Sequence, residues 1–300
     1  DKNFDNESEN NIINLKLDKK DYKTSDVEIF VQSDNNTINT KEFKKYLDIQ
    51  EQHNLIKDQI INLNSNFTIN ASIDDTFNIK KFAIKSNLNF DNLNINYRSN
   101  FIKKYLTSFD NKIAIKNPQI LFEYSNDIIN FQLDGKYLLQ NKEDNFFIKY
   151  KGSENNYELY TLLNLDDSDL KIDEIQYLKK KNIPSKLEIL LNKSTNGFNL
   201  QKISFTENKN YISIDNLYIS DDFKLQSVDK IDANFFNSKG VKNNFQIKKN
   251  SNNYQFIGNQ IDGEKIIEKL LRNNNETKIS NFFDNLNTSV NLNLEKIYLE

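Results

Sequence analysis

The chain has 300 residues, a formal charge of -3 and 37% hydrophobic residues, with no cysteine and no methionine. Its mean hydropathy of -0.74 is low for a compact globule. The 12% of aromatic residues and the persistent apolar alternation nevertheless argue against disorder. Together these features indicate a thin β-structure with one solvent-exposed face. Interspersed charges exclude a basic stripe that would follow a nucleic acid, and the missing cysteines exclude disulfides and thiolate metal sites.

The first third of the chain is predicted to contain strands and one helical segment. Apolar residues alternate in two runs before residue 32, which predicts two strands. Lys41–Leu63 is predicted to be helical, with Asn39 or Thr40 as its cap. The middle of this segment is polar, so one long helix and two short helices both fit. His53, the only histidine, lies there and is interpreted as a surface residue.

Strands dominate the sequence from Asn66 onward. Asn100–Phe109 is predicted to be a short helix, and Pro118 is expected at a strand edge or turn. Asp134 and Gly135 look like a hairpin turn, but the apolar residues on both sides keep one register. We therefore predict one long strand through Gly135, where the missing side chain permits a bend or a close approach.

The best candidate boundary is Lys179–Ser185, which combines three lysines with a proline. It predicts an N-terminal part, residues 1–180, with the helical insertion near 41–63, and a C-terminal β-unit, residues 181–300. The chain opens at Asp1 and lacks methionine, so we expect it to be a piece cut from a longer protein, in which a signal or an anchor could precede this segment.

One apolar pattern of eight residues recurs, with apolar residues at its first, third, sixth and eighth positions. The fourth and fifth positions form a polar pair, which puts two residues instead of one between the apolar residues on either side. The extra residue shifts the alternation, so either a two-residue hairpin or a β-bulge must restore the apolar face. The polar pairs contain no glycine, which tight hairpin turns favour, and the bulge is therefore preferred. The pairs are Lys80-Lys81, Asp91-Asn92, Asp173-Glu174, Gln201-Lys202, Asp215-Asn216 and Glu295-Lys296.

No catalytic arrangement is recognised. The acidic run Asp166–Asp169 has calcium-loop spacing, but it lacks a central glycine and has Tyr177 where a closing glutamate is needed, so it is interpreted as a solvated turn. Ser227 and Lys230 match a serine–lysine spacing without any accompanying motif. We expect no enzyme activity, no cofactor and no metal site.

The fold class expected is mainly β: an elongated, curled antiparallel sheet, groove-like, with a few short helices. Its apolar residues should share one face of the sheet. The candidates for that face are Ile203, Phe205, Ile212, Ile214, Leu217, Ile219, Phe223, Leu225, Phe245, Ile247, Tyr254 and Phe256.

A motif near the C-terminus resembles a feature of the AsmA-like envelope proteins, of the AsmA/YhdP/TamB type. In that family a strand ends in glycine, an aspartate opens a short amphipathic helix, and paired leucines close it. The resemblance covers about Val27–Leu271, and Gly263 departs from it because the family usually has an apolar residue there. The helix is predicted at Asp262–Arg272, with Asp262 capping its N-terminus. The matching residues are Gly258, Asp262, Ile266, Ile267, Leu270 and Leu271.

The resemblance implies a function in lipid transport. AsmA-like proteins resemble bridge-like lipid carriers, whose apolar channel shields phospholipid acyl chains from water. It implies a periplasmic protein, held at the inner membrane by a segment outside this fragment and involved in outer-membrane and envelope biogenesis. The alternative is a structural β-rich surface or adhesin-like segment, whose apolar face would be closed against a second sheet and hold no ligand.

Overall fold

The computed structural model describes residues 4–8, 11–20, 23–41, 56–139, 142–251, 253–271 and 289–299. Its contacts divide the chain into two compact units. Unit 1 comprises Asp1–Arg98, Asn111–Leu139 and Asn145–Glu154, and unit 2 comprises Ser99–Asp110, Gln140–Asp144 and Asn155–Glu300. Both units are built mainly from β-strands, which confirms the predicted fold class.

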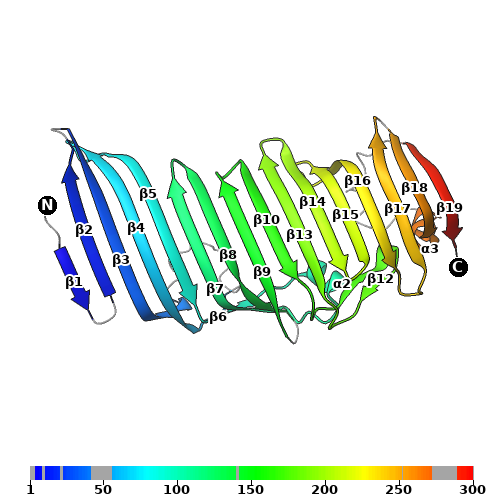
Figure 1. The fold of residues 1–300 in the computed structure, drawn as a ribbon, viewed down its shortest axis with the longest axis horizontal. Helices are drawn as coiled ribbons and strands as arrows, with labels where there is room; N and C mark the ends of the chain where they lie inside the picture. Colours follow the sequence, from blue (N-terminus) through cyan, green and yellow to red (C-terminus); the bar gives the residue numbers. More distant parts are fainter. Residues whose placement is uncertain are drawn as a thin grey trace. The chain divides into compact units, whose positions relative to one another are not determined.

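In unit 1, strands that follow one another along the chain lie side by side and antiparallel (Figure 1). The exception is the strand β7, which pairs with β5 along one half and with the short β6 along the other. The strands are β1 (Phe4–Ser8), β2 (Asn11–Lys19), β3 (Thr24–Asn39), β4 (Ile60–Asp74), β5 (Ile79–Phe90), β6 (Asn92–Asn96), β7 (Lys112–Ser125), β8 (Ile128–Leu138) and β9 (Glu143–Gly152).

Unit 2 repeats this meander and adds short elements at its ends. Its main strands are β10 (Tyr157–Asn164), β13 (Ser185–Ser194), β14 (Gly197–Glu207), β15 (Asn210–Ile219), β16 (Leu225–Phe236), β17 (Lys242–Asn250), β18 (Asn253–Asp262) and β19 (Ser289–Tyr298). The short elements are the helices α2 (Asn100–Tyr105) and α3 (Glu264–Leu271), and the two-stranded sheet of β11 (Leu170–Ile172) and β12 (Tyr177–Lys179), joined by the 3₁₀ turn η1 (Asp173–Ile175). The predicted boundary segment Lys179–Ser185 connects β12 to β13 inside this unit.

One strand pair departs from the antiparallel pattern. The strand β19 runs parallel to β18, with Tyr254 opposite Val290 and Ile261 opposite Ile297. Parallel neighbours need a connection that returns the chain to the same end of the sheet, and here α3 lies in that connection. The meander expected from the sequence therefore ends at β18.

The predicted helix Lys41–Leu63 is wrong at its C-terminal end. Residues 40 and 41 are helical and the Asn39 side chain accepts a hydrogen bond from the Lys41 N–H, but Ile60–Leu63 begin β4. There Ile61 lies opposite Ile38, and this cross-strand contact outweighs the helical spacing seen in the sequence. Residues 42–55, and His53 with them, lie outside the described residues.

The polar pairs of the recurring pattern mostly lie inside continuous strands. In β14 the register with β13 shifts beside Gln201, and in β15 Asn216 adopts a left-handed conformation with φ 51°. These irregularities confirm the bulge interpretation for the two strands. The pair Asp173-Glu174 differs, because it lies in η1 between the paired strands β11 and β12, so the hairpin interpretation holds there.

The strand β8 runs through Gly135 without a turn, as predicted. A β-carbon at Gly135 would lie 3.0 Å from the Pro118 Cα and 3.2 Å from the Lys116 carbonyl oxygen, so the glycine permits a close backbone approach. Pro118 was expected at a strand edge or turn, but it is buried inside β7 at a shift of register. A bulge tolerates proline there because the ladder is already interrupted.

The strand β18 does not end at Gly258, contrary to the resemblance, but continues to Asp262. A β-carbon at Gly258 would lie 2.4 Å from the Asn244 carbonyl oxygen and 2.7 Å from the Phe245 Cα. The glycine therefore serves the close contact of β18 with β17 at a register shift rather than a strand end. Gly263 is confined similarly, since its β-carbon would lie 2.9 Å from the Ile297 side chain.

Two of these glycines, Gly258 and Gly135, predict a ranking of stability. Gly258→Ala should lower the free energy of unfolding by about 3 kcal/mol, because backbone atoms cannot yield to the added methyl group. Gly135→Ala should cost about 1 kcal/mol, since its contacts are several tenths of an ångström longer. Urea denaturation of both variants measures this, and equal costs or the reverse order would contradict the packing described.

Candidate functional site

Two rows of apolar side chains cross one face of unit 2. Residues directly opposite one another on neighbouring strands point to the same face of a sheet. One row contains Leu187, Phe205, Ile212, Ala233 and Phe245. The other row contains Ile189, Ile203, Ile214, Ile231, Ile247 and Phe256.

The opposite face of these strands is polar. Lys202 pairs with Glu188 at 2.8 Å, and Lys230 pairs with Asp232 at 3.0 Å. Ser213 lies on this face, directly opposite Asp232 on the neighbouring strand. The unit therefore separates its apolar and charged side chains onto two faces, as the alternation predicted.

The apolar alternation changes phase at Asn216. Before this residue, the exposed Tyr211 alternates with the half-buried Ile212, and after it the exposed Tyr218 alternates with the half-buried Leu217. The left-handed Asn216 thus returns the apolar residues of β15 to one face, so Ile212 and Ile219 share it. Leu217 lies opposite Val228, and Ile219 lies opposite Leu225, which is buried.

Tyr254 of β18 also lies on this face and contacts β16 through a hydrogen bond. It has the same parity along β18 as Phe256, whose ring stacks on Phe245 with centroids 5.0 Å apart. The Tyr254 hydroxyl accepts a hydrogen bond from the Val228 N–H at 3.1 Å, and both residues are buried.

Phe223 is the one predicted member outside the face. It lies in the turn between β15 and β16 with φ 60°, and 70% of its surface is exposed. The alternation that included it with Leu225 is wrong, because the turn reverses the chain between Ser220 and Lys224.

Within the described residues, most side chains of the apolar face are half-buried rather than buried. The five central residues Ile203, Ile214, Ile231, Ile247 and Phe256 are all half-buried. Unit 1 has a similar face, where Ile69, Ile84 and Tyr124 form a half-buried row. Among the described residues the only other sheet is the two-stranded β11–β12. The apolar faces therefore derive their burial from neighbours in the same layer.

The small sheet β11–β12 covers one end of the apolar face in unit 2. Tyr177 is buried and packs edge-on against Phe205 and Phe235, with ring centroids 5.7 and 5.5 Å apart. Its hydroxyl donates a hydrogen bond to the buried Glu207 carboxylate, which also accepts from the Asn210 side chain. Burial, followed by this carboxylate, raises the pKa of Tyr177, which keeps the phenol protonated.

The fully buried Lys179, at the end of β12, binds the loop that precedes β11. The Lys179 ammonium donates to the carbonyl oxygens of Asp166 at 3.0 Å, Ser168 at 2.7 Å and Lys180 at 3.2 Å. Burial lowers the pKa of Lys179, and the three carbonyls satisfy its three donors. This arrangement is structural, because no donor remains for a ligand.

The acidic run Asp166–Asp169 forms the turn expected from the sequence, but it is packed against the protein rather than solvated. The buried Asp144 carboxylate accepts from the N–H groups of Asp166 at 3.1 Å and Asp167 at 3.2 Å, and burial raises its pKa. The Asp169 carboxylate accepts from the hydroxyls of Thr107 and Ser108. The run is packed because its backbone wraps the Lys179 ammonium. Lys179 has the same strand parity as Tyr177, a signal that the sequence analysis missed.

The motif that carried the family resemblance is partly described. Asp262 is buried, and its carboxylate accepts from the Glu264 N–H at 3.2 Å and from the Asn237 side chain at 2.7 Å. This confirms the predicted cap of α3. Ile267 is half-buried, whereas the side chains of Ile266, Leu270 and Leu271 lie outside the described residues.

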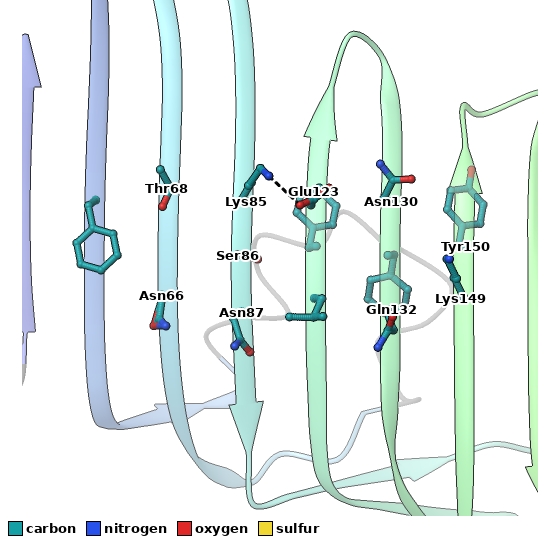
Figure 2. Close-up of a pocket in the computed structure, with 14 residues that line it drawn as sticks. Asn66, Thr68, Lys85, Ser86, Asn87, Glu123, Asn130, Gln132, Lys149 and Tyr150 are labelled. Atoms are coloured by element: carbon teal, nitrogen blue, oxygen red, sulfur yellow. Dashed lines mark ion pairs between the residues drawn. The ribbon is translucent and has the colours of Figure 1, made fainter.

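A hollow of about 460 Å³ with mixed lining lies on unit 1 (Figure 2). Its lining residues Thr68, Lys85 and Glu123 alternate along their strands with the row of Ile69, Ile84 and Tyr124, so the hollow lies on the other face. An ion pair of 3.1 Å between Lys85 and Glu123 crosses it from β5 to β7. Amide and hydroxyl side chains surround this pair, among them Asn66, Thr68, Asn87, Asn130 and Gln132. The rest of the lining includes apolar and aromatic side chains, so the hollow combines an ion pair and amide groups with Phe30, Leu121, Phe122, Phe131 and Tyr150.

Within the ranges that the structure describes, no group of three or more His, Cys, Asp or Glu side chains is placed to hold a metal ion. In those same ranges, no helix has both the length and the apolar character needed to cross a membrane. Comparisons with protein-family models, curated proteins and solved structures found no match.

The buried ammonium makes a stability prediction. Lys179→Ala should lower the free energy of unfolding by about 2–4 kcal/mol, because three buried carbonyls lose charged donors. Lys180→Ala is the matched control: its side chain is exposed, and the backbone carbonyl that binds Lys179 is kept. Urea denaturation compares the two. Similar costs would show that the Lys179 contacts do not stabilise unit 2.

Proposed function

We propose that this protein holds the acyl chains of phospholipids along its apolar sheet face, as part of lipid transport in a bacterial cell envelope. The supporting observation is the half-buried row of Ile203, Ile214 and Ile231 with its neighbours, on a sheet whose other face is charged. An acyl chain laid along this row would gain about 0.8 kcal/mol for each CH₂ group removed from water. No reactive side chain is needed, which agrees with the expectation of no enzyme activity.

The lipid headgroup would stay in water while its chains lie on the sheet. The polar face, with pairs such as Lys230–Asp232, faces away from the chains and remains hydrated. Tyr177 closes one end of the apolar face in unit 2, so chains would occupy the part around Ile214 rather than Phe205. This assigns the lipid to a particular stretch of the strands.

The resemblance to AsmA-like proteins supports the same proposal. On the same basis we propose a periplasmic location with attachment to the inner membrane. Of the motif residues, Asp262 caps α3 as the resemblance implies, whereas β18 continues past Gly258. The alternative, a structural surface segment, requires a partner sheet on the apolar face instead of lipid.

Photocrosslinking at two adjacent positions tests the proposal. A photoreactive residue at position 214 should label phospholipid, because Ile214 lies on the apolar face. The same residue at position 213 should not, because Ser213 lies on the charged face. Equal labelling at the two positions in folded protein, or none at either, would remove the lipid-carrier proposal and favour the structural alternative.

A charge on the apolar face provides a second test. Ile214→Asp should abolish crosslinking from position 247, two strands away in the same row, because a carboxylate there must be buried unpaired against the chain. Ser213→Asp is the matched control on the same strand and should leave labelling unchanged. Circular dichroism of both variants checks folding, and mass spectrometry of purified protein should detect bound phospholipid.

A further inference from the structure

Three hairpin turns in this chain have the same backbone structure. They span residues 74–78, 220–224 and 237–241. In each, the N–H of the first residue donates to the carbonyl of the fifth at 2.9–3.0 Å, and the N–H of the fourth donates to the carbonyl of the first at 2.9–3.0 Å. The first side chain, Asp74, Ser220 or Asn237, also accepts from the N–H of the fifth residue.

The fourth position of this turn is left-handed, and two of the three turns place phenylalanine there. Gly240 has φ 79°, which suits glycine. Phe77 has φ 63° and Phe223 has φ 60°. Most other non-glycine residues with positive φ in the described chain are asparagine, which tolerates this conformation better than an aromatic residue does. Both phenylalanines are therefore strained where the third turn is not.

Packing against the protein does not account for these residues. Phe77 is 88% exposed, and Phe223 is 70% exposed although its ring stacks on Phe198 with centroids 5.7 Å apart. Next to Phe77, Ile79 is 61% exposed. A large apolar side chain that is both strained and exposed is unfavourable in water, so an apolar environment outside the protein would explain its position.

We propose that Phe77 and Phe223 are membrane-contact residues, each inserting a hairpin tip into the interface of a lipid bilayer. A bilayer suits these tips better than a protein partner does, because each tip offers little more than one aromatic side chain. A stable protein interface needs roughly 800 Å² on each partner. Aromatic residues are favoured at the boundary between headgroups and acyl chains.

The charges around the tips indicate what kind of bilayer is bound. Asp74 pairs with Lys80 at 2.9 Å beside Phe77, and Asp222 pairs with Lys224 at 2.9 Å beside Phe223. Because both tips carry balanced charge, attraction to anionic lipid contributes little. Binding should therefore occur on zwitterionic phosphatidylcholine and change little with salt. This inference does not depend on lipid being held along the apolar face.

Sedimentation of the full chain with phosphatidylcholine vesicles tests the inference. The wild-type protein should bind with similar affinity at about 0.05 M and about 0.5 M salt. Phe77→Asn and Phe223→Asn should each weaken binding by about tenfold, and the double variant should lose it. Gly240→Asn alters the same position of the third turn and should bind like the wild type.

Stability separates a membrane role from a structural one. Phe77→Asn should raise the midpoint of thermal unfolding of the protein by roughly 2–4 °C, because asparagine relieves the strain and no packing is lost. Phe77→Trp should keep vesicle binding. The inference is overturned by a wild-type protein that ignores the vesicles, by a double variant that binds normally, or by a lower unfolding midpoint for Phe77→Asn.

Discussion

The register between neighbouring strands is the constraint on which the rest of this structure depends. In a two-layer protein, a slipped strand still finds apolar atoms in the layer above it. Here the described strands of each unit form a single layer over most of their area, so each isoleucine gains contacts mainly from the residue opposite it. A slip of one residue would move a whole row to the charged face. The ion pairs of that face, such as Lys202 with Glu188, therefore fix the same register as the apolar rows.

The bulges keep the apolar residues of each long strand on one face of the sheet. A long strand twists, and strict alternation over ten or more residues would direct its ends away from a common face. Asn216 interrupts the alternation in β15, and Gln201 lies beside the corresponding shift in β14. The recurring polar pair in the sequence thus marks the place where the chain restores the face. At Phe205 the apolar face is covered by Tyr177, which belongs to the separate hairpin β11–β12. The buried Lys179 binds this hairpin to the preceding loop.

The sequence predicted the mainly β fold, the bulges and the apolar rows well, because period-two alternation reports directly which face each residue occupies. It misplaced Ile60–Leu63, where helical and strand spacings coincide over a few residues and the strand partner lies more than twenty residues earlier. It also missed Asp144 and Glu207, because their burial depends on partners 22 and 30 residues away in the chain. Lys179 was missed although its strand parity with Tyr177 was an available signal. Phe223 was misassigned since alternation continues by chance into a turn.

The order of strands in each unit also bears on how the chain reaches its folded state. Because nearly every strand pairs with the one just before it, each new hairpin closes only a short loop, and the ordering entropy is offset step by step. Such a sheet can grow from one end as residues leave the ribosome, without waiting for distant segments. The parallel strand β19 is different, since it must find β18 across the helix α3 and the residues that follow it. Within unit 2, pairing of β19 with β18 is therefore a more non-local step than the hairpins before it, because its partner residues lie 36 positions apart, as in Asn253 opposite Ser289.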